Sequence, residues 1–563
     1  MESPSGPYKP DDEERNYYYV GFTGNPRLVA RTSDYHWSPP QRYAGWGNME
    51  DQTRTIQLRK QYVAITDQEM ISKWTKDVSY AIIKALERCN WCYFFPSTIR
   101  LESTCELLPT EAPQPTSWTV LLVAVQEDSL QWELGISIAL ECRDILRAFD
   151  ISNVEVEIRE GRYTHHAASA QLEARIDNEL WGTETNKAIL PMLSYPGYPI
   201  GYLEGRKSRG TIGLHLKLQG DDESTVYGLT CRHVVDNGRA THQPYKISGD
   251  YRQYHVQGDD NAFSECLEKT NRVQAGLIES AGFLERKKSH WDQWYVHDET
   301  KKHKCFTKED HESLQFLRAQ IAYNTSIIEH LKAVSEKEKR IIGHLAFHPS
   351  LEVSSQQPGY LRDWALIKLD PKKFIHNPQN EIFIDSPISA FLSHGRNIKF
   401  LTLHLKDELE QLNDYYQVGK RGGHTGMTFG TKSGIEAVVR HPTLDGKAFY
   451  TWELLVVPGP GYTNFSDKGD SGSCVFNGDG CVVGLVTSSS DAKPEHMWRG
   501  LPRGGSWRLV RYSGSNSQSE DENDTPHNEM PTWPIGTDVT FVAPIEWVLK
   551  DIRDFTGCQP ILL

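Results

Sequence analysis

The chain has few cysteines, no excess of basic residues and no long apolar run, and each of these shortages excludes a class of protein. Its 10 cysteines among 563 residues are too dilute for a disulfide scaffold, which favours reduced thiols and a cytoplasmic location. A net charge of -14 argues against a nucleic-acid partner, because phosphate neutralisation needs a basic face. We also expect no membrane partner, since no apolar segment reaches the roughly 20 residues that span a bilayer. The polar, proline-containing start of the chain lacks the apolar core of a secretory signal.

The most informative stretch is Lys-Gly-Asp-Ser-Gly-Ser, from Lys468 to Ser473. Glycine on both sides of Ser471 permits a tight turn and lets a substrate approach without meeting a Cβ atom. The backbone N–H groups of Gly469 and Ser471 can converge on one point and stabilise a developing oxyanion. The pattern therefore predicts that the Ser471 hydroxyl is a nucleophile.

Two upstream residues have the local settings that such a serine requires. His233 directly follows the short apolar segment Val226–Leu229, which predicts a strand, and Asp363 opens an apolar run of strand length. A serine hydroxyl needs a base to take its proton, and the base needs an acid that fixes its tautomer. The order His, Asp, Ser is one of three known solutions and is the one used on paired β-barrels. Three other aspartates compete for the role of the acid, although none begins an apolar strand: Asp259, Asp260 and Asp370.

On these residues the sequence resembles the trypsin-like (chymotrypsin-fold) serine proteases, in particular their intracellular members. The resemblance extends from about Ile200 to Phe555, with one large interruption. Six blocks carry it in the family's order: Thr230–Val235 around the histidine, Asp363–Ile367, the hairpin Val418–Gly430, Gly469–Ser473, the hairpin Val475–Val486, and the closing strand and helix Phe541–Leu549.

The resemblance implies a trypsin-like double antiparallel β-barrel. The length of the chain and the periodicity outside the six blocks add an N-terminal α/β unit before it and a helical insertion within it, so the expected fold is multidomain. The first barrel would span 198–370 with an insert at about 260–345, and the second 395–555, with an acidic loop at about 514–530 and a C-terminal helix. It implies His233, Asp363 and Ser471 as catalytic residues and the N–H groups of Gly469 and Ser471 as the oxyanion hole.

The implied activity is hydrolysis of peptide bonds in a protein or peptide substrate by a serine endopeptidase, without cofactor or metal. By the family's motif the substrate pocket involves Phe465, Thr487, Ser488 and Ser489. None of these is an acid, so a preference for Lys or Arg is not implied, while small apolar and acidic side chains both stay open. The alternative is a catalytically inactive trypsin-like fold that serves as a protein-binding or signalling module.

Asp470 departs from the pattern of the secreted relatives, in which the aspartate before the serine binds a newly freed chain terminus. A long N-terminal region precedes the barrels here. We therefore expect Asp470 to pair with other donors near the oxyanion loop, and regulation to come from the N-terminal domain or the helical insert.

The N-terminal region predicts an irregular aromatic-rich arm over 1–50 and an α/β domain over 51–190. Residues 118–125 predict a strand, 128–149 an amphipathic helix and 154–158 an alternating strand. Strand, helix and strand in this order favour a right-handed crossover. A further helix over 78–95 is predicted to lead into an aromatic cluster.

The helical insert contains apolar residues at alternating spacings of three and four between Leu314 and Leu331, with Asn324 in one position of the seam. This pattern predicts a coiled coil or a long amphipathic helix. The helix either lies on its own barrel or self-associates through residues 310–340, in which case Asn324 would specify the dimer. The charged, His-rich stretch 290–304 predicts a linker.

Two patterns resemble metal sites. Cys89 and Cys92 have the spacing of a zinc knuckle with Cys105 downstream, but no second pair completes it at finger spacing. His165 and His166 are adjacent, so both rings cannot easily face one ion. We expect buried structural cysteines and no metal.

Overall fold

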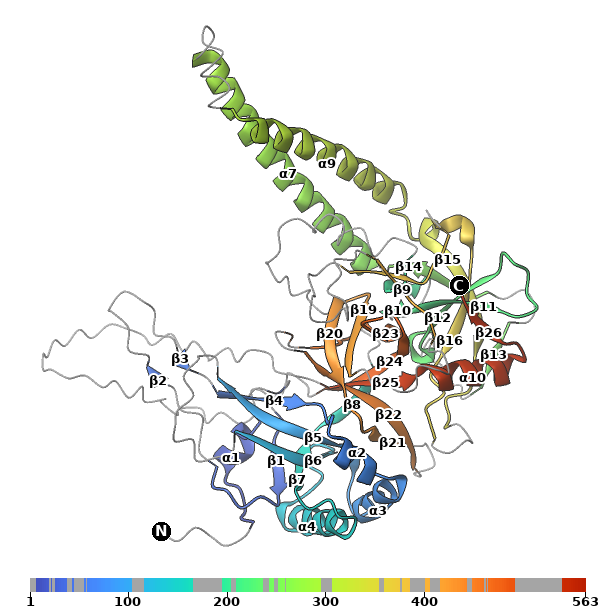
Figure 1. Cartoon of the computed structure of the whole chain (residues 1–563). Helices are drawn as coiled ribbons and strands as arrows, with labels where there is room; N and C mark the ends of the chain where they lie inside the picture. Colours follow the sequence, from blue (N-terminus) through green and yellow to red (C-terminus); the bar gives the residue numbers. More distant parts are fainter. Residues whose placement is uncertain are drawn as a thin grey trace, which may run out of the picture. The chain divides into compact units, whose positions relative to one another are not determined.

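The computed structural model describes residues 7–19, 22, 26–37, 43–44, 55–56, 58–103, 116–165, 195–203, 209–235, 243–247, 252–258, 260–294, 306–353, 359–374, 377–384, 400–405, 416–442, 448–459, 462, 464–491 and 539–563. The predicted acidic loop at about 514–530, Cys105 and His166 lie outside this range. The chain forms two compact units, one of residues 1–163 with 490–539 and one of residues 164–489 with 540–563. It is multidomain and mostly β-sheet, as predicted (Figure 1).

The first unit contains a mixed sheet with strand order β1-β7-β6-β5-β4. Strands β6 and β7 are parallel and α4 connects them, which confirms the predicted strand-helix-strand unit. The helix buries Ile138, Cys142 and Leu146. The elements of this part of the chain are α1 Asp12–Tyr17, β1 Leu28–Arg31, β2 Tyr43–Ala44, β3 Thr55–Ile56, β4 Leu58–Val63, α2 Gln68–Lys73, α3 Lys76–Leu86, β5 Trp91–Ser103, β6 Ser117–Val125, α4 Trp132–Ala148, β7 Glu155–Glu160 and β8 Arg162–His165.

Two N-terminal predictions are wrong in part. The helix predicted over 78–95 ends at Leu86, and Trp91–Ser103 forms strand β5, which pairs along its length with β6. Aromatic residues favour strands when a neighbouring strand is available for pairing, and this pairing is not visible in local periodicity. The predicted irregular arm contributes β1, which pairs antiparallel with β7 and is buried throughout.

A buried polar cluster lies beside this sheet. Glu157 of β7 accepts hydrogen bonds from the hydroxyls of Tyr18 at 2.7 Å and Tyr19 at 2.6 Å, and from Trp118 Nε1 at 3.0 Å. Lys60 of β4 is buried with its Nζ 3.1 Å from the centroid of the Tyr18 ring. Burial lowers the pKa of Lys60 to about 7, although the charge of Glu157 opposes the shift.

The second unit contains a nine-stranded, curled antiparallel sheet with the order β10-β9-β14-β15-β16-β12-β11-β26, in which β13 also pairs with β15. The C-terminal strand β26 completes this sheet by pairing with β11, which the sequence did not predict. The elements are β9 Tyr198–Tyr202, β10 Arg209–Ile212, β11 Leu214–Leu218, β12 Val226–Thr230, α6 Arg232–Val235, β13 Tyr245–Lys246, β14 Tyr254–Gln257, η2 Lys337–Arg340, β15 Ile341–His348, β16 Ala365–Leu369, η3 Pro371–Lys373 and β26 Pro560–Leu562; β17 Glu381–Phe383 and β18 Phe400–Thr402 form a separate pair.

Six other described strands of this unit form a closed ring. The pairing runs β22-β20-β19-β23-β24-β25 and returns from β25 to β22, all antiparallel, and β21 pairs with β22. Both hairpins predicted here, β19–β20 and β23–β24, are confirmed. The strands are β19 Gln417–Gly422, β20 Gly426–Lys432, β21 Ala437–Pro442, β22 Ala448–Pro458, β23 Cys474–Asn477, β24 Val482–Asp491 and β25 Thr540–Pro544. Helix α10, Ile545–Thr556, follows β25, as predicted.

Two long helices, α7 Asp260–Trp294 and α9 Lys308–Ala333, interrupt the curled sheet between β14 and β15 and lie side by side (Figure 1). Thr307 caps α9 through a capping box with Asp310. The seam of α9 packs against α7, and Asn324 Nδ2 donates to Thr270 O at 3.1 Å. The insert is therefore a hairpin in which the α9 seam contacts α7 rather than the sheet, and residues 290–294 of the predicted linker are helical.

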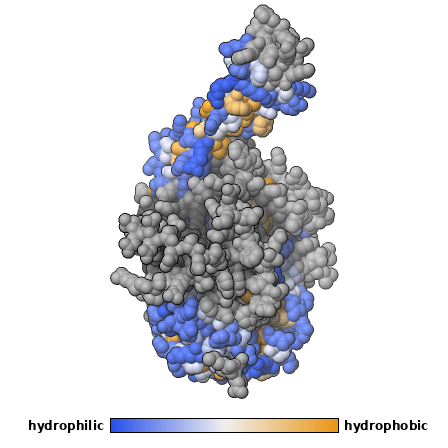
Figure 2. All heavy atoms as spheres, turned by 90° about the vertical axis from the view of Figure 1, so that its left-hand side faces the viewer, coloured by the Kyte–Doolittle hydropathy of each residue, from blue (hydrophilic) through white to orange (hydrophobic). Residues whose placement is uncertain are grey.

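Apolar residues of the hairpin appear as orange among blue in the upper part of Figure 2. The large, mostly apolar side chains that the hairpin exposes are Ile278, Phe283, Phe316 and Tyr323. No helix of the described residues combines the length and apolar character that crossing a bilayer would need.

Candidate functional site

His233 and Asp363 form the centre of the site. Asp363 Oδ2 is 2.6 Å from His233 Nδ1, and Asp363 Oδ1 accepts the backbone N–H of His233 at 2.9 Å. The Asp363 side chain is fully buried, whereas the His233 side chain is 11% exposed. One carboxylate thus fixes both the position of the histidine backbone and the orientation of its ring.

The curled sheet brings these two residues together across 130 positions of sequence. Strands β12 and β16 are antiparallel, with Thr230 opposite Ala365, so the end of one strand lies beside the start of the other. His233 follows β12 in the short helix α6. The intervening residues include the helical hairpin, whose ends return the chain to the same sheet.

The two residues on either side of Asp363 donate hydrogen bonds to the same carboxylate oxygen. Asp551 Oδ2 of helix α10 accepts hydrogen bonds from Arg362 Nε at 2.9 Å and from Trp364 Nε1 at 2.7 Å. Of the competing aspartates, Asp260 instead pairs with Arg340 at 2.7 Å, and Asp370 caps η3. Asp259 lies outside the described residues. Asp363 is the aspartate that the fold places against His233.

The loop that carries Ser471 packs against the end of β12, the strand that leads to His233. Val486 O accepts both the N–H of Gly472 at 2.8 Å and the thiol of Cys231 at 3.2 Å. Ser471 O accepts the N–H of Thr211 at 2.8 Å. Gly472 and Cys231 thus share one acceptor. Gly472 directly follows Ser471, and Cys231 lies two positions before His233, so the two segments of chain lie side by side.

The loop is tightly packed and has two glycines in the left-handed region. Gly469 has a φ of +105° and Gly472 a φ of +90°, values that L side chains rarely adopt. A Cβ on Gly472 would lie 2.3 Å from Thr211 O. Within the described part of the chain, neither the Gly469 N–H nor the Ser471 N–H donates to a protein acceptor. Both N–H groups belong to buried residues.

Asp470, between these two residues, is completely buried and has a dense set of partners. Its Oδ2 is 3.1 Å from Lys420 Nζ, which is equally buried, and accepts the Thr425 hydroxyl at 2.6 Å. Burial by itself would raise the pKa of Asp470, but the Lys420 charge and the hydrogen bonds hold this pKa well below its usual range. Asp470 therefore pairs with donors inside the chain.

Ser471 itself is 0% exposed, and its hydroxyl donates to Thr487 O at 3.2 Å. The other residues assigned to a pocket are also buried: Phe465, Thr487, Ser488 and Ser489. Phe465 belongs to a core cluster with valines of five ring strands, while Ser488 Oγ has no hydrogen-bond partner among the residues that the structure describes.

Two charged residues near the site were not predicted from the sequence. Lys420 lies on β19 and Glu453 on β22, where Glu453 Oε2 accepts the Thr487 hydroxyl at 2.7 Å. Glu453 is the charged residue of a largely apolar strand, and Lys420 lies with Arg421 between two glycines of β19. Both are buried, and a buried charge needs a partner. A charge within an otherwise apolar strand is the signal that identifies a residue such as Glu453.

The same centre is where metal-ligating atoms gather. Among the described residues, atoms of Cys231, His233 and Asp363 lie within 4.8 Å of one another. Burial, with a smaller contribution from Asp363, raises the pKa of the Cys231 thiol and so disfavours the thiolate that a metal would need. Cys89 and Cys92 are half-buried thiols, and Cys92 lies on strand β5 rather than on a helix.

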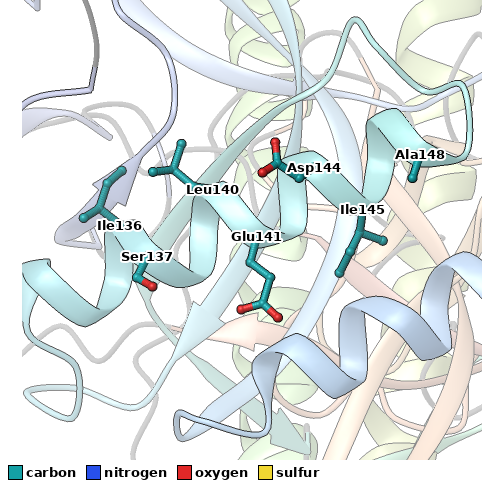
Figure 3. Close-up of a pocket in the computed structure, with 7 residues that line it drawn as sticks. All are labelled: Ile136, Ser137, Leu140, Glu141, Asp144, Ile145 and Ala148. Carbon is teal, nitrogen blue, oxygen red and sulfur yellow. The ribbon is translucent and has the colours of Figure 1, made fainter.

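A shallow pocket in the first unit is a separate feature. All of its lining residues project from one helix, α4 (Figure 3). Glu141 of this pocket forms an exposed ion pair with Arg88 at 2.9 Å. Because all of the lining residues belong to one helix, the pocket does not combine functional groups from different elements as an active site usually does.

No protein-family model matches this chain, and no curated protein matches its sequence.

Proposed function

We propose that the chain is a serine endopeptidase of the trypsin-like type, built on two β-barrels and using Ser471, His233 and Asp363. The observation that carries the proposal is the pairing of His233 Nδ1 with Asp363 Oδ2 at 2.6 Å, beside a loop with a serine between two glycines. The closed ring of strands and the curled sheet are compatible with the two barrels. This arrangement supplies a nucleophile, a base and an orienting acid.

In the proposed reaction Ser471 Oγ attacks the scissile carbonyl, and His233 Nε2 takes the hydroxyl proton as the O–C bond forms. The N–H groups of Gly469 and Ser471 stabilise the oxyanion, each contributing about 3–4 kcal/mol. The C–N bond then breaks, and His233 returns the proton to the leaving amine. Water, activated by His233, hydrolyses the acyl-enzyme and restores the serine. Asp363 holds the imidazole in the required tautomer throughout.

The resting hydrogen bond must change for this reaction to occur. The Ser471 hydroxyl donates to Thr487 O, so this hydrogen bond must break and Ser471 Oγ must come within hydrogen-bond reach of His233 Nε2 before the serine attacks. Because Ser471 is 0% exposed, a substrate also has to displace what covers it. The same observation favours a second candidate function, an inactive fold that serves as a protein-binding or signalling module.

One experiment separates the two candidates. The purified full-length chain is treated with a fluorophosphonate probe, which loses fluoride as the serine oxygen bonds to phosphorus. The proposal predicts labelling of the wild type and none of Ser471→Ala. The control is Ser326→Ala on the exposed surface of helix α9, which should still label. Absence of labelling in a folded wild type favours the binding module. Equal labelling of Ser471→Ala shows that another residue reacts and overturns the assignment of Ser471. Peptide-library profiling of a labelled enzyme then identifies the preferred side chain.

A further inference from the structure

The second unit contains a buried ion pair next to Ser471 that the triad does not use. Lys420 Nζ lies 3.1 Å from Asp470 Oδ2, and both side chains are 0% exposed. Removing two charges from water is costly, and the pair is tolerated only where further hydrogen bonds satisfy it. A pair of this kind therefore indicates that the Asp470 side chain is fixed in one conformation.

The hydrogen bonds around the pair tie the β19–β20 turn to the loop. Asp470 Oδ1 accepts the N–H groups of His424 at 3.0 Å and Thr425 at 3.1 Å. Asp470 Oδ2 accepts the N–H of Asp467 at 3.0 Å. The Thr425 hydroxyl, which donates to Asp470, accepts in turn from Lys420 Nζ at 2.5 Å. The Asp470 carboxylate thus has partners in the β19–β20 turn, in its own loop and on strand β19.

The backbone of Asp470 connects this pair to the N–H groups of Gly469 and Ser471. The Ser471 N–H lies in the peptide unit that Asp470 shares with Ser471, so a shift of Asp470 reorients it directly. The Gly469 N–H lies one peptide unit further on the other side and moves through Gly469. Asp470 O also accepts the N–H of Ser473 at 2.9 Å. The turn fits closely here, because a Cβ on Gly422 would lie 2.1 Å from Asp470 Oδ1.

We propose that Lys420 is a positioning residue, whose buried ammonium group fixes Asp470 and thereby holds the Gly469 and Ser471 N–H groups in the oxyanion-binding arrangement. This inference rests on the proposed function and concerns how the same site is kept competent. The chain itself supplies the cation, so no new terminus has to be generated by cleavage. The intact single chain is competent once substrate reaches Ser471.

Three variants test this in the full-length protein by the rate of fluorophosphonate labelling. Lys420→Met leaves the buried carboxylate without its cation and is expected to slow labelling at least 100-fold. Lys420→Arg keeps the charge and is expected to stay within tenfold of the wild type. Lys287→Met is the control, since it breaks an ion pair of 2.7 Å with Asp310 in the helical hairpin. It is expected to label within twofold of the wild type.

A pH series distinguishes positioning from simple loss of folding. Without the cation, burial raises the pKa of Asp470, so the protonated form is stable at low pH and the loop loses its arrangement as pH rises. The ratio of variant to wild-type labelling should therefore increase as pH falls, because dividing by the wild type removes the ionisation of the base. The other charged or titratable groups near the pair are Arg209, Arg421, His424 and Asp467.

The outcomes are separable. A wild type that labels through Ser471, together with a folded Lys420→Met that labels equally well, overturns the positioning role and leaves the proposed function intact. An unlabelled wild type overturns the proposed function and this inference with it. If Lys420→Met does not fold, Lys420→Met/Asp470→Asn removes both charges. In that folded double variant, labelling slowed at least tenfold supports the inference, and wild-type labelling overturns it.

Discussion

Gly213 provides a sharp test of how the Ser471 loop is seated. This glycine lies between β10 and β11, and its N–H donates to Leu229 O at 3.0 Å. A Cβ at this position would lie 2.1 Å from Gly472 O and 2.7 Å from Cys474 N. We therefore predict that Gly213→Ala forces the loop away from the end of β12.

The size of the effect follows from these distances. A carbon–oxygen contact is ordinarily about 3.3 Å, so the Gly472 carbonyl would have to move by about 1 Å. Overpacking of this kind costs roughly 1–3 kcal/mol of stability. A displacement of about 1 Å in a catalytic arrangement can cost roughly 100-fold in rate. Fluorophosphonate labelling should thus slow about 100-fold, with a moderate loss of thermal stability.

Gly276→Ala is the matched control for this substitution. Gly276 lies within helix α7, and a Cβ there meets nothing within 4 Å. Alanine is preferred over glycine in a helix by about 1 kcal/mol, so this variant should be slightly more stable and label like the wild type. A folded Gly213→Ala that labels within twofold of the wild type and unfolds at the same temperature would contradict this seating of the loop.

Two further predictions concern other buried charges. Asp363→Asn should preserve the fold but slow labelling by about 10,000-fold, because the amide cannot hold His233 in the required tautomer; an activity loss below tenfold would show that Asp363 is not the orienting acid. Lys60, whose pKa is lowered to about 7 by burial, binds fewer protons in the folded state, so the stability of the first unit should rise as pH increases from 7 towards the ordinary value of 10.5. Lys60→Met should remove this dependence, measured by denaturant unfolding across that range, and an unchanged pH profile would contradict the assignment.

Much of the site could be predicted from short segments because each residue there has a local signature. The glycines around Ser471 predict a turn, the apolar run before His233 predicts a strand, and the run after Asp363 predicts another. The pairing of His233 with this aspartate could not be established from sequence alone, since three other aspartates were available. The antiparallel register of β12 and β16 places Asp363, and not another aspartate, next to His233.

The sequence by itself determined the local elements: the strand-helix-strand unit, the two hairpins, the amphipathic helix with Asn324 in its seam, and the order of the three site residues. The tertiary structure alone decided which groups far apart in the chain meet, including the α9 seam with α7, the last strand with β11, and Lys420 with Asp470. The physical reason is that side-chain periodicity reports which face of an element is buried but not what covers it. The partner of a buried charge is likewise set by packing across the whole unit.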